Sequence, residues 1–409
     1  MPKVSVIIPA WNLWDMTASC LRSLAEHTPG EEMEVLVVDN GSHDGTAEHL
    51  PVLGRNFFGE NFREIRLPQN MGFAVACNAG ARAATGNLLF FLNNDTVVGP
   101  NWLPPLIETM NSPGIGATGP LLLYPDGSVQ HCGIAVSPFR GLCHIYEHFP
   151  GTHALPRKQR LLQAITGAAL MLRKEDFFRA GAFFEDYLNG FEDVDLCCAL
   201  RHMGLRLVLN PQSVVVHHTS RTPGRFDADK HNAELLTRRR RAEIQPDLHL
   251  LAARDGYRLC AGRTLTCWLS LPETREESLD AELEARQKAP DFDMAMLEHL
   301  LTEEPLWLGG HLRRIDMLEA AGRRRKALAA ALSALDFFPL PQIQTRLTRL
   351  ARREGMRNEL APLLNRLAEE ANSETKAFRP AVRAVRREAR NGNDAVLTRI
   401  MDDWLTLYG

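Results

Sequence analysis

Short apolar runs alternate with amphipathic stretches along roughly the first hundred residues of the chain. The apolar runs cover residues 4–8, 34–38, 65–67 and 87–92, the third being the weakest. Nearly continuous apolar runs are typical of strands that are covered on both faces. Residues 15–26 and 72–84 have helical spacing and lie between runs. The alternation predicts an α/β fold with a mainly parallel sheet covered by helices.

The second half of the chain differs, because helical periodicity continues almost without interruption from about residue 272. Gly322, Gly355 and Gly392 separate the apolar stripes at intervals of 33 and 37 residues. These intervals are close to the ~34-residue period of helix-turn-helix repeats. Small residues after Gly322 match half of one tetratricopeptide motif, and the later units lack them. A small α-helical bundle and a short tetratricopeptide-like solenoid therefore both remain open.

Length and composition agree with an ordinary multidomain globular protein. The chain has 409 residues, of which 45% are hydrophobic and 24% charged, and this length fits two or three domains. We expect an α/β domain at 1–225, a helical extension or linker at 226–271 and an α-helical domain at 272–409. A formal charge of -3 argues against a nucleic-acid partner, because such proteins are normally strongly basic.

The sequence predicts no membrane-spanning segment. No apolar run approaches the roughly 18 residues that a transmembrane helix needs. The first residues carry one positive charge and an apolar run too short for a secretory signal. The eight cysteines are scattered and form no C-x-x-C pair, which favours reduced thiols. We therefore expect a protein that is cytoplasmic or peripheral to the inner membrane.

Polar and small residues directly follow the predicted strands. Ligands bind beyond the carboxyl ends of strands in sheets of this type, so these positions form the candidate site. They are Pro9, Ala10, Asn12, Asp39, Ser42, Asn70, Gly72, Asn94, Asp95, Gly167, Ala168 and His217. No glycine-rich G-x-G-x-x-G motif follows the first strand, which disfavours dinucleotide binding.

Each acidic candidate has a structural alternative when it is taken alone. Asp39 can bind a nucleotide or open a turn, and Asp95 can hold a divalent cation or close an Asx turn. Glu192 and Asp193 lie at the start of a predicted helix, where a carboxylate can serve as a base or simply favour the helix dipole. His217 can be a metal ligand or a structural residue. Their joint position at one rim predicts a single site.

The order of five motifs resembles the inverting family 2 glycosyltransferases with a GT-A fold, particularly the rhamnosyltransferase-like branch. The resemblance covers about residues 1–225. The motifs are Val6-Ile7-Ile8-Pro9, Asp39-Asn40-Gly41-Ser42-x-Asp44-Gly45-Thr46, Asn70-x-Gly72-Phe73-Ala74, Leu92-Asn93-Asn94-Asp95 and Gly190-Phe191-Glu192-Asp193-Val194-Asp195-Leu196.

The resemblance implies a nucleotide-sugar donor, a divalent cation and a catalytic base. It places the donor on Pro9, Ala10, Asn12, Asp39, Ser42, Asn70, Gly72, Asn78, Asn94, Asp95, Gly167 and Ala168. It implies Mg²⁺ or Mn²⁺ at Asp95 and His217, and a base at Asp193 beside Glu192. Residues 126–131 resemble a loop that flanks the same pocket. Asn93 replaces the first carboxylate of the family's D-x-D motif, which weakens the implication of strict metal dependence.

We therefore expect an inverting enzyme that moves a sugar from a UDP- or dTDP-sugar to a saccharide, lipid-linked or protein acceptor. The Q-x-x-R-W motif of processive synthases is absent, so we expect single additions. The alternative is a degenerate transferase-fold scaffold that acts through its helical domain. In either case residues 272–409 are a candidate surface for a protein partner. A zinc site at His131-Cys132 and Cys143-His144 is disfavoured, because the spacing matches no common module.

Overall fold

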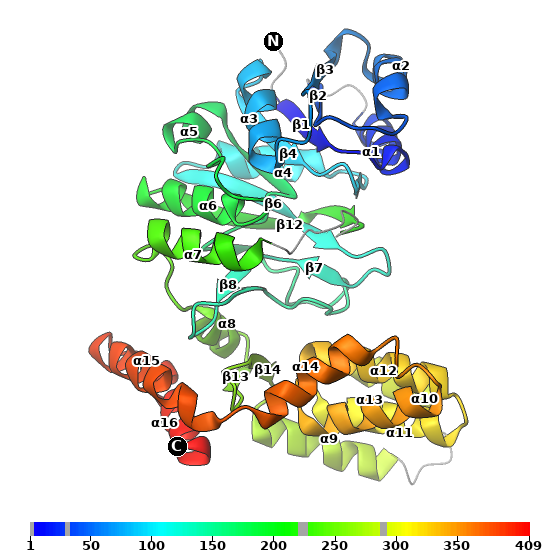
Figure 1. Cartoon of the computed structure of the whole chain (residues 1–409), viewed down its shortest axis with the longest axis vertical. Coiled ribbons are helices and arrows are strands. Elements are labelled where there is room, and N and C mark those ends of the chain that lie inside the picture. Colours follow the sequence, from blue (N-terminus) through cyan, green and yellow to red (C-terminus); the bar gives the residue numbers. More distant parts are fainter. Residues whose placement is uncertain (1–3, 29–32, 220–227, 287–292) are drawn as a thin grey trace. The chain divides into compact units, whose positions relative to one another are not determined.

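The computed structural model describes residues 4–28, 33–219, 228–286 and 293–409. It divides into two compact units, the first made of residues 1–135 and 142–245 and the second of residues 136–141 and 246–409. Figure 1 shows the α/β elements of the first unit and the mainly helical second unit.

A ten-stranded mixed sheet forms the centre of the first unit. Its order is β10-β12-β6-β11-β4-β1-β2-β3, with β5 paired to β12 and β7 paired to β6. Strands β1 to β4 pair in parallel, as do β6 and β12, whereas β11 is antiparallel to both its neighbours. The strands are β1 (Val4–Ala10), β2 (Met33–Asp39), β3 (Phe62–Arg66), β4 (Leu88–Leu92), β5 (Thr96–Val98), β6 (Ile115–Leu123), β7 (Val129–His131), β10 (Arg160–Leu162), β11 (Ala169–Arg173) and β12 (Arg206–His217). A short pair, β8 (Ile134–Val136) and β9 (Leu142–His144), lies outside this sheet.

Helices cover both faces of the sheet, which confirms the predicted α/β class. The helices of this part are α1 (Trp14–His27), α2 (Thr46–Phe58), α3 (Phe73–Ala83), α4 (Leu103–Asn111), α5 (Lys174–Arg179), α6 (Glu192–His202) and α7 (Asp229–Arg240), with a 3-10 turn η1 (Gly59–Asn61). Alternate residues of β1 face opposite layers, as the pleat requires. Val4, Val6 and Ile8 belong to one core cluster together with residues of α1 and α4, whereas Ile7 meets Gly80 of α3.

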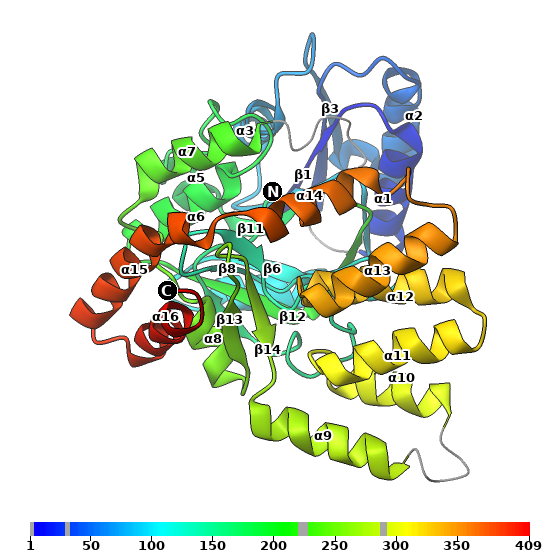
Figure 2. The same cartoon turned by 60° about the horizontal axis from the view of Figure 1, so that its bottom comes forward.

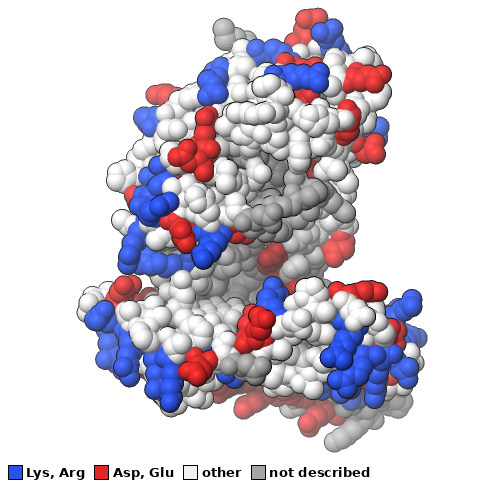
Figure 3. Space-filling model, in the orientation of Figure 1, with Lys and Arg blue, Asp and Glu red and all other residues white. Residues whose placement is uncertain are grey.

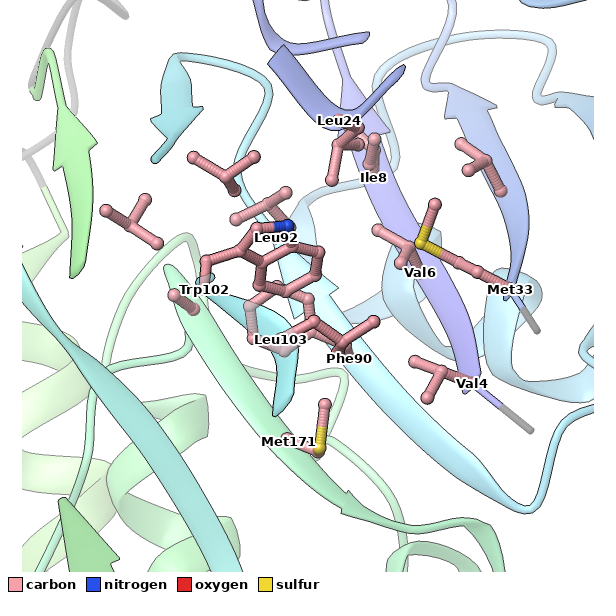
Figure 4. Close-up of a cluster of buried hydrophobic side chains, with 14 of the residues drawn as sticks. Val4, Val6, Ile8, Leu24, Met33, Phe90, Leu92, Trp102, Leu103 and Met171 are labelled. Atoms are coloured by element: carbon pink, nitrogen blue, oxygen red, sulfur yellow. The ribbon is translucent and has the colours of Figure 1, made fainter. Parts of the chain in front are cut away.

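Large apolar side chains fill the layer between β1, β4 and α4 (Figure 4). The ring centroids of Phe90 and Trp102 lie 4.9 Å apart, and the Trp102 side chain is fully buried. The Trp102 indole N–H donates to Thr28 Oγ1 at 3.3 Å, so its one polar atom is satisfied. This packing fixes the carboxyl ends of β1 and β4, where candidate residues Ala10 and Asp95 lie.

One glycine of the Asp39–Ser42 turn is required by its surroundings. Gly41 has φ +75°, and a Cβ placed on it would lie 2.4 Å from Gln69 Cα. Gly41→Ala should therefore lower the free energy of unfolding by about 1–3 kcal/mol, measured by urea denaturation. Gly59→Ala is the matched control, because Gly59 also has positive φ (+56°) and no atom within 4 Å of such a Cβ. Equal losses in the two variants would contradict the backbone clash.

The second unit contains a strand hairpin followed by helices. Strands β13 (Arg258–Ala261) and β14 (Cys267–Ser270) pair antiparallel after α8 (Leu248–Arg254). The helical extension or linker expected at 226–271 contains this hairpin in addition to α7 and α8. Its two four-residue strands leave no long apolar run in the sequence. No helix within the described ranges is both long and apolar enough to cross a membrane.

The helical region predicted from residue 272 is confirmed. Figures 1 and 2 show α9 to α13 gathered in one group, in which α10 to α13 contact each other in sequence order and α9 contacts α11. Gly322 and Gly355 each have φ +72° directly after a helix, the usual role of glycine at a helix end. The helices are α9 (Glu273–Arg286), α10 (Met294–Glu303), α11 (Leu308–Ala320), α12 (Arg324–Phe337), α13 (Pro341–Arg353), α14 (Ala361–Asn372), α15 (Arg379–Asn391) and α16 (Ala395–Tyr408), with a 3-10 turn η2 (Thr375–Phe378).

Candidate active site

A cavity of about 410 Å³ opens at the carboxyl ends of β1 and β4. Most of the residues predicted for the site border it. Those residues are Pro9, Ala10, Asn70, Asn94, Asp95, Gly167, Ala168, Glu192, Asp193 and His217. The elements that supply them are far apart in the sequence and meet here because parallel strands end at one edge of the sheet.

Asp95 and His217 form one corner of the cavity. His217 Nε2 lies 3.0 Å from Asp95 Oδ1, and the pairing of β5 with β12 brings the two residues together. On the other side of the ring, His217 Nδ1 lies 2.8 Å from Gln130 Oε1. Burial alone would raise the pKa of Asp95, but the hydrogen bond and charge of His217 lower it below its ordinary value. Asp95 is therefore held as a carboxylate facing an imidazole nitrogen.

The Asp95 corner carries a donor set that fits Mg²⁺ or Mn²⁺. The Asp95 carboxylate suits either ion and the His217 imidazole is a softer second ligand, while such a cation usually completes its shell with water and substrate phosphates. The Gln130 contact also matches the way a ligand histidine is normally oriented through its second nitrogen. Within the residues that the structure describes, no group of three His, Cys, Asp or Glu side chains could hold a metal ion alone. A cation here would thus need further oxygen ligands from water or from the diphosphate of a substrate.

Asp193 lies in the first turn of α6 and borders the cavity. Its Oδ2 accepts a hydrogen bond from the Gly167 N–H at 2.7 Å, and its Oδ1 accepts one from the Val194 N–H at 2.8 Å. A Cβ on Gly167 would lie 3.2 Å from Asp193 Cβ, so the glycine permits this close approach. These two backbone donors fix the direction of the Asp193 carboxylate.

Glu192, the other acid of the pair, shapes the turn before α6. It is buried, and its Oε2 accepts from the Gly190 N–H at 2.6 Å. Phe191, which lies between Gly190 and Glu192, has φ +75°, a conformation rare for an aromatic residue. Glu192 therefore stabilises the chain reversal that presents Asp193 to the cavity.

The predicted nucleotide-binding residues form a hydrogen-bonded set beside this cavity. Asp39 Oδ1 accepts from the Ser42 N–H at 2.9 Å, and Ser42 Oγ accepts from the Asn12 N–H at 2.8 Å. Asn70 Oδ1 accepts from the Gly72 N–H at 3.0 Å. Asp39, Ser42, Asn12 and Gly72 do not border the 410 Å³ cavity, whereas Asn70 does.

Asp39 has an unusual environment, because its side chain is fully buried. Among the described residues, its Oδ2 has no hydrogen-bond partner, although Arg66 Nε lies 3.6 Å away. A buried carboxylate oxygen without a hydrogen bond is costly unless a ligand supplies the donor.

Asn78 differs from the other candidates, because its amide is used within the protein. Asn78 Nδ2 donates to the Phe183 carbonyl at 2.8 Å and to Glu185 Oε1 at 2.9 Å. Its Oδ1 accepts from the Phe183 N–H. These bonds tie α3 to the segment before α6, away from the cavity lining.

Comparison with known proteins identifies the family. The model of Glycosyl transferase family 2 matches residues 5–178. The N-acetylglucosaminyl-diphospho-decaprenol L-rhamnosyltransferase of Mycobacterium tuberculosis is 30% identical over 233 residues, which are 50% of this chain and 72% of that protein. This chain belongs to glycosyltransferase family 2. The transferase therefore has the GT-A fold and the glycosyltransferase domain that its motifs predicted.

Other relatives of the transferase are considerably longer. The O-antigen biosynthesis protein RfbC of Myxococcus xanthus is 33% identical over 225 residues, covering 54% of this chain and 17% of that protein. An uncharacterized protein, y4gI of Sinorhizobium fredii, is 30% identical over 240 residues, covering 57% and 26%. The chain thus spans about a quarter or less of these two relatives.

Solved structures also resemble the transferase at low sequence identity. GalNAc-T7 with UDP, GalNAc and Mn²⁺ aligns with a TM-score of 0.45 at 18% identity, over 53% of this chain and 44% of that one. The mannosyltransferase PcManGT of Pyrobaculum calidifontis, in complex with GDP-Man and Mn²⁺, aligns with a TM-score of 0.44 at 19% identity, over 86% and 84%.

Several cavity residues of the transferase were not chosen from the sequence. Tyr124, Gln130, His144 and Glu147 all border the cavity. The hydroxyl of Tyr124 lies 2.6 Å from Glu147 Oε1. The resemblance of residues 126–131 to a pocket-flanking loop pointed toward Gln130, whereas three-residue strands such as β7 and β9 show no periodicity.

The arginine run at 238–241 interacts partly with the protein rather than facing solvent throughout. Figure 3 shows basic side chains in the region of α7. Arg239 and Arg240 reach the buried carboxylate of Asp195 at 3.0 and 2.5 Å, while Arg238 is exposed. These pairs dock α7 on α6, the helix that carries Asp193.

Proposed function

We propose that the transferase moves a single sugar, with inversion, from a UDP- or dTDP-sugar to an acceptor hydroxyl. The observation that supports this most directly is one cavity of about 410 Å³ bordered by both the Asp193 carboxylate and the Asp95–His217 pair. A base and an anion-binding corner in one pocket are what a displacement of a nucleotide diphosphate requires.

The proposed reaction is one displacement. Asp193 accepts the proton of the acceptor hydroxyl as that O–H bond breaks, and the oxygen forms a bond to the anomeric carbon. The bond from that carbon to the diphosphate oxygen breaks on the opposite face, and its electron pair leaves with the nucleotide diphosphate. Asp95 and His217 would hold Mg²⁺ or Mn²⁺, which supplies positive charge beside the diphosphate.

The nucleotide is proposed to bind between Pro9–Ala10 and the Asp39–Ser42 turn, with Asn70 and Asn94 near the diphosphate. Asp39 Oδ2 is buried without a hydrogen-bond partner in the described part of the chain. It would accept a hydrogen bond from an N–H of the nucleobase. Gly167 and Ala168 would line the donor sugar. The name of the mycobacterial relative favours a saccharide on a lipid diphosphate as the acceptor.

The helical region at 272–409 is proposed to act as a tetratricopeptide-like surface for a protein partner. Helices α10 to α13, which contact each other in sequence order, support this role. We propose that the enzyme works in the cytoplasm or at the inner membrane surface.

A panel of nucleotide sugars tests the proposed function. At least one UDP- or dTDP-sugar should raise the melting temperature of the purified protein and be slowly hydrolysed. Asp39→Asn keeps an oxygen for the Ser42 N–H but presents an NH₂ group to the N–H of the nucleobase. The affinity for the nucleotide should therefore fall roughly tenfold or more. Isothermal titration with the nucleotide diphosphate measures it. A scaffold would show neither stabilisation nor hydrolysis above background.

A further inference from the structure

Two histidines, His131 buried and His144 half-buried, connect a backbone amide to the cavity. The Thr166 N–H donates to His131 Nε2 at 3.4 Å, and His131 Nδ1 lies 2.8 Å from His144 Nδ1. His131 is in β7 and is 1% exposed, while His144 ends β9 and borders the cavity. The proposed mechanism uses neither residue.

The direction of this chain of hydrogen bonds follows from its first member. A backbone N–H can only donate, so His131 Nε2 must accept and the proton of a neutral His131 is on Nδ1. That proton is donated to His144 Nδ1, which leaves the proton of His144 on Nε2. Burial lowers the pKa of both rings, so each remains a neutral imidazole.

The second nitrogen of His144, Nε2, is available to a ligand in the cavity. His144 Nδ1 pairs with His131, no hydrogen bond joins its Nε2 to a residue in the described ranges, and the side chain borders the cavity. Burial lowers the pKa of His144, whereas the negative charges of Glu147 and Asp193 act to raise it. His144 therefore places an N–H donor in the same cavity as the carboxylate of the proposed base.

We propose that His144 selects acceptors that carry two neighbouring hydroxyls. The hydroxyl to be glycosylated donates its proton to Asp193, and the oxygen of the adjacent hydroxyl accepts from His144 Nε2–H. The acceptor is then a saccharide with a vicinal diol rather than an isolated alcohol such as a serine side chain. His131 is a positioning residue that fixes the tautomer of His144. This inference rests on the proposed function and adds its acceptor class.

A cycle of enzyme and acceptor variants tests the selection. Transfer is measured first on a set of p-nitrophenyl pyranosides. A pyranoside that the enzyme glycosylates is then compared with its deoxy analogue, which lacks the hydroxyl next to the glycosylated one. For the wild type, this deoxygenation should lower kcat/KM roughly tenfold, as expected for one lost hydrogen bond. His144→Ala should raise the acceptor KM roughly tenfold with a smaller change in donor KM, and deoxygenation should then cost it less than about twofold.

The control and the contradicting results separate this inference from the proposed function. His202→Ala, whose side chain is 75% exposed in a surface pair with Glu243, should match the wild type on both acceptors. If deoxygenation lowered kcat/KM of His144→Ala as much as that of the wild type, the inference would be overturned and the proposed function would stand. Equal transfer to N-acetylserine amide and to pyranosides would have the same consequence. A wild-type enzyme that uses no nucleotide sugar would instead overturn the proposed function.

Nitrogen-15 NMR gives a readout that needs no activity. In the wild type, His144 should show a protonated Nε2 and an unprotonated Nδ1, and the tautomer preference should weaken in His131→Phe. An Nδ1-protonated His144 in the wild type would overturn the inference even if the His131 variant failed to fold.

Discussion

Replacing Asp193 by Asn should lower the rate of sugar transfer by roughly 10²-fold or more, the usual contribution of a general base. The amide cannot accept the acceptor proton, because its oxygen is far less basic than a carboxylate. Asn still offers one oxygen to the Gly167 N–H, which Asp193 Oδ2 accepts at 2.7 Å, so the local fold should persist. Initial rates with saturating donor measure the effect, and nucleotide affinity should change little.

A nearby surface acid provides the control for Asp193. Asp186 is exposed and precedes α6, so Asp186→Asn removes the same charge without touching the cavity. Its transfer rate should stay within twofold of the wild type. Near-wild-type turnover by Asp193→Asn would assign the proton transfer to another group.

The fold was predictable where the apolar signal is long. Strands β1, β2 and β4 follow from nearly continuous apolar runs, and α1 and α3 follow from helical spacing. The weaker β3 begins at Phe62, three residues before its predicted start. Strands β5, β7, β9 and β10 are three residues long, too short to show a period of two. Their places depend on pairing with distant partners, which no local pattern records.

The site was predictable in part for the same reason. Asp95, Asp193 and His217 follow or begin strongly patterned elements, and they share one cavity. Asp39 also ends such a strand, but its side chain is fully buried, bonded to the Ser42 N–H, and does not border that cavity. Gln130 and His144 come from short strands, so their contacts with His217 and His131 could be found only in three dimensions.

The proposed chemistry requires the rim to be rigid on both sides of the cavity. On one side Glu192 holds the turn before α6, and Asp195 ties that helix to α7 through two arginines. On the other side Asn94 Nδ2 donates to Thr17 Oγ1 at 2.9 Å, which fixes the loop that carries Asp95 to α1. Proton transfer and displacement are sensitive to such positioning, because small misplacements of reacting groups slow them strongly.

Removing the Asp95 carboxylate should be comparably damaging. Asp95→Ala takes away the one carboxylate at this corner and leaves His217 Nε2 without the partner at 3.0 Å, so transfer should fall roughly 10²-fold or more. Chelation of divalent cations should cause a similar loss in the wild type. Applied to the variant, chelation should add little, because both treatments remove the same interaction. Full activity of the wild type in EDTA would show that the corner acts without a cation.

The position before Asn94 offers the converse test of the same corner. Asn93 Nδ2 lies 3.3 Å from His217 Nε2, so Asn93→Asp places a second carboxylate beside Asp95 and His217. Mn²⁺ should then bind roughly tenfold more tightly in the absence of donor, since added ligand charge raises cation affinity. Electron paramagnetic resonance titration with Mn²⁺ alone measures this. Unchanged affinity would mean that residue 93 faces away from the bound ion. The cation would then be held entirely by Asp95, His217 and the diphosphate of the sugar donor.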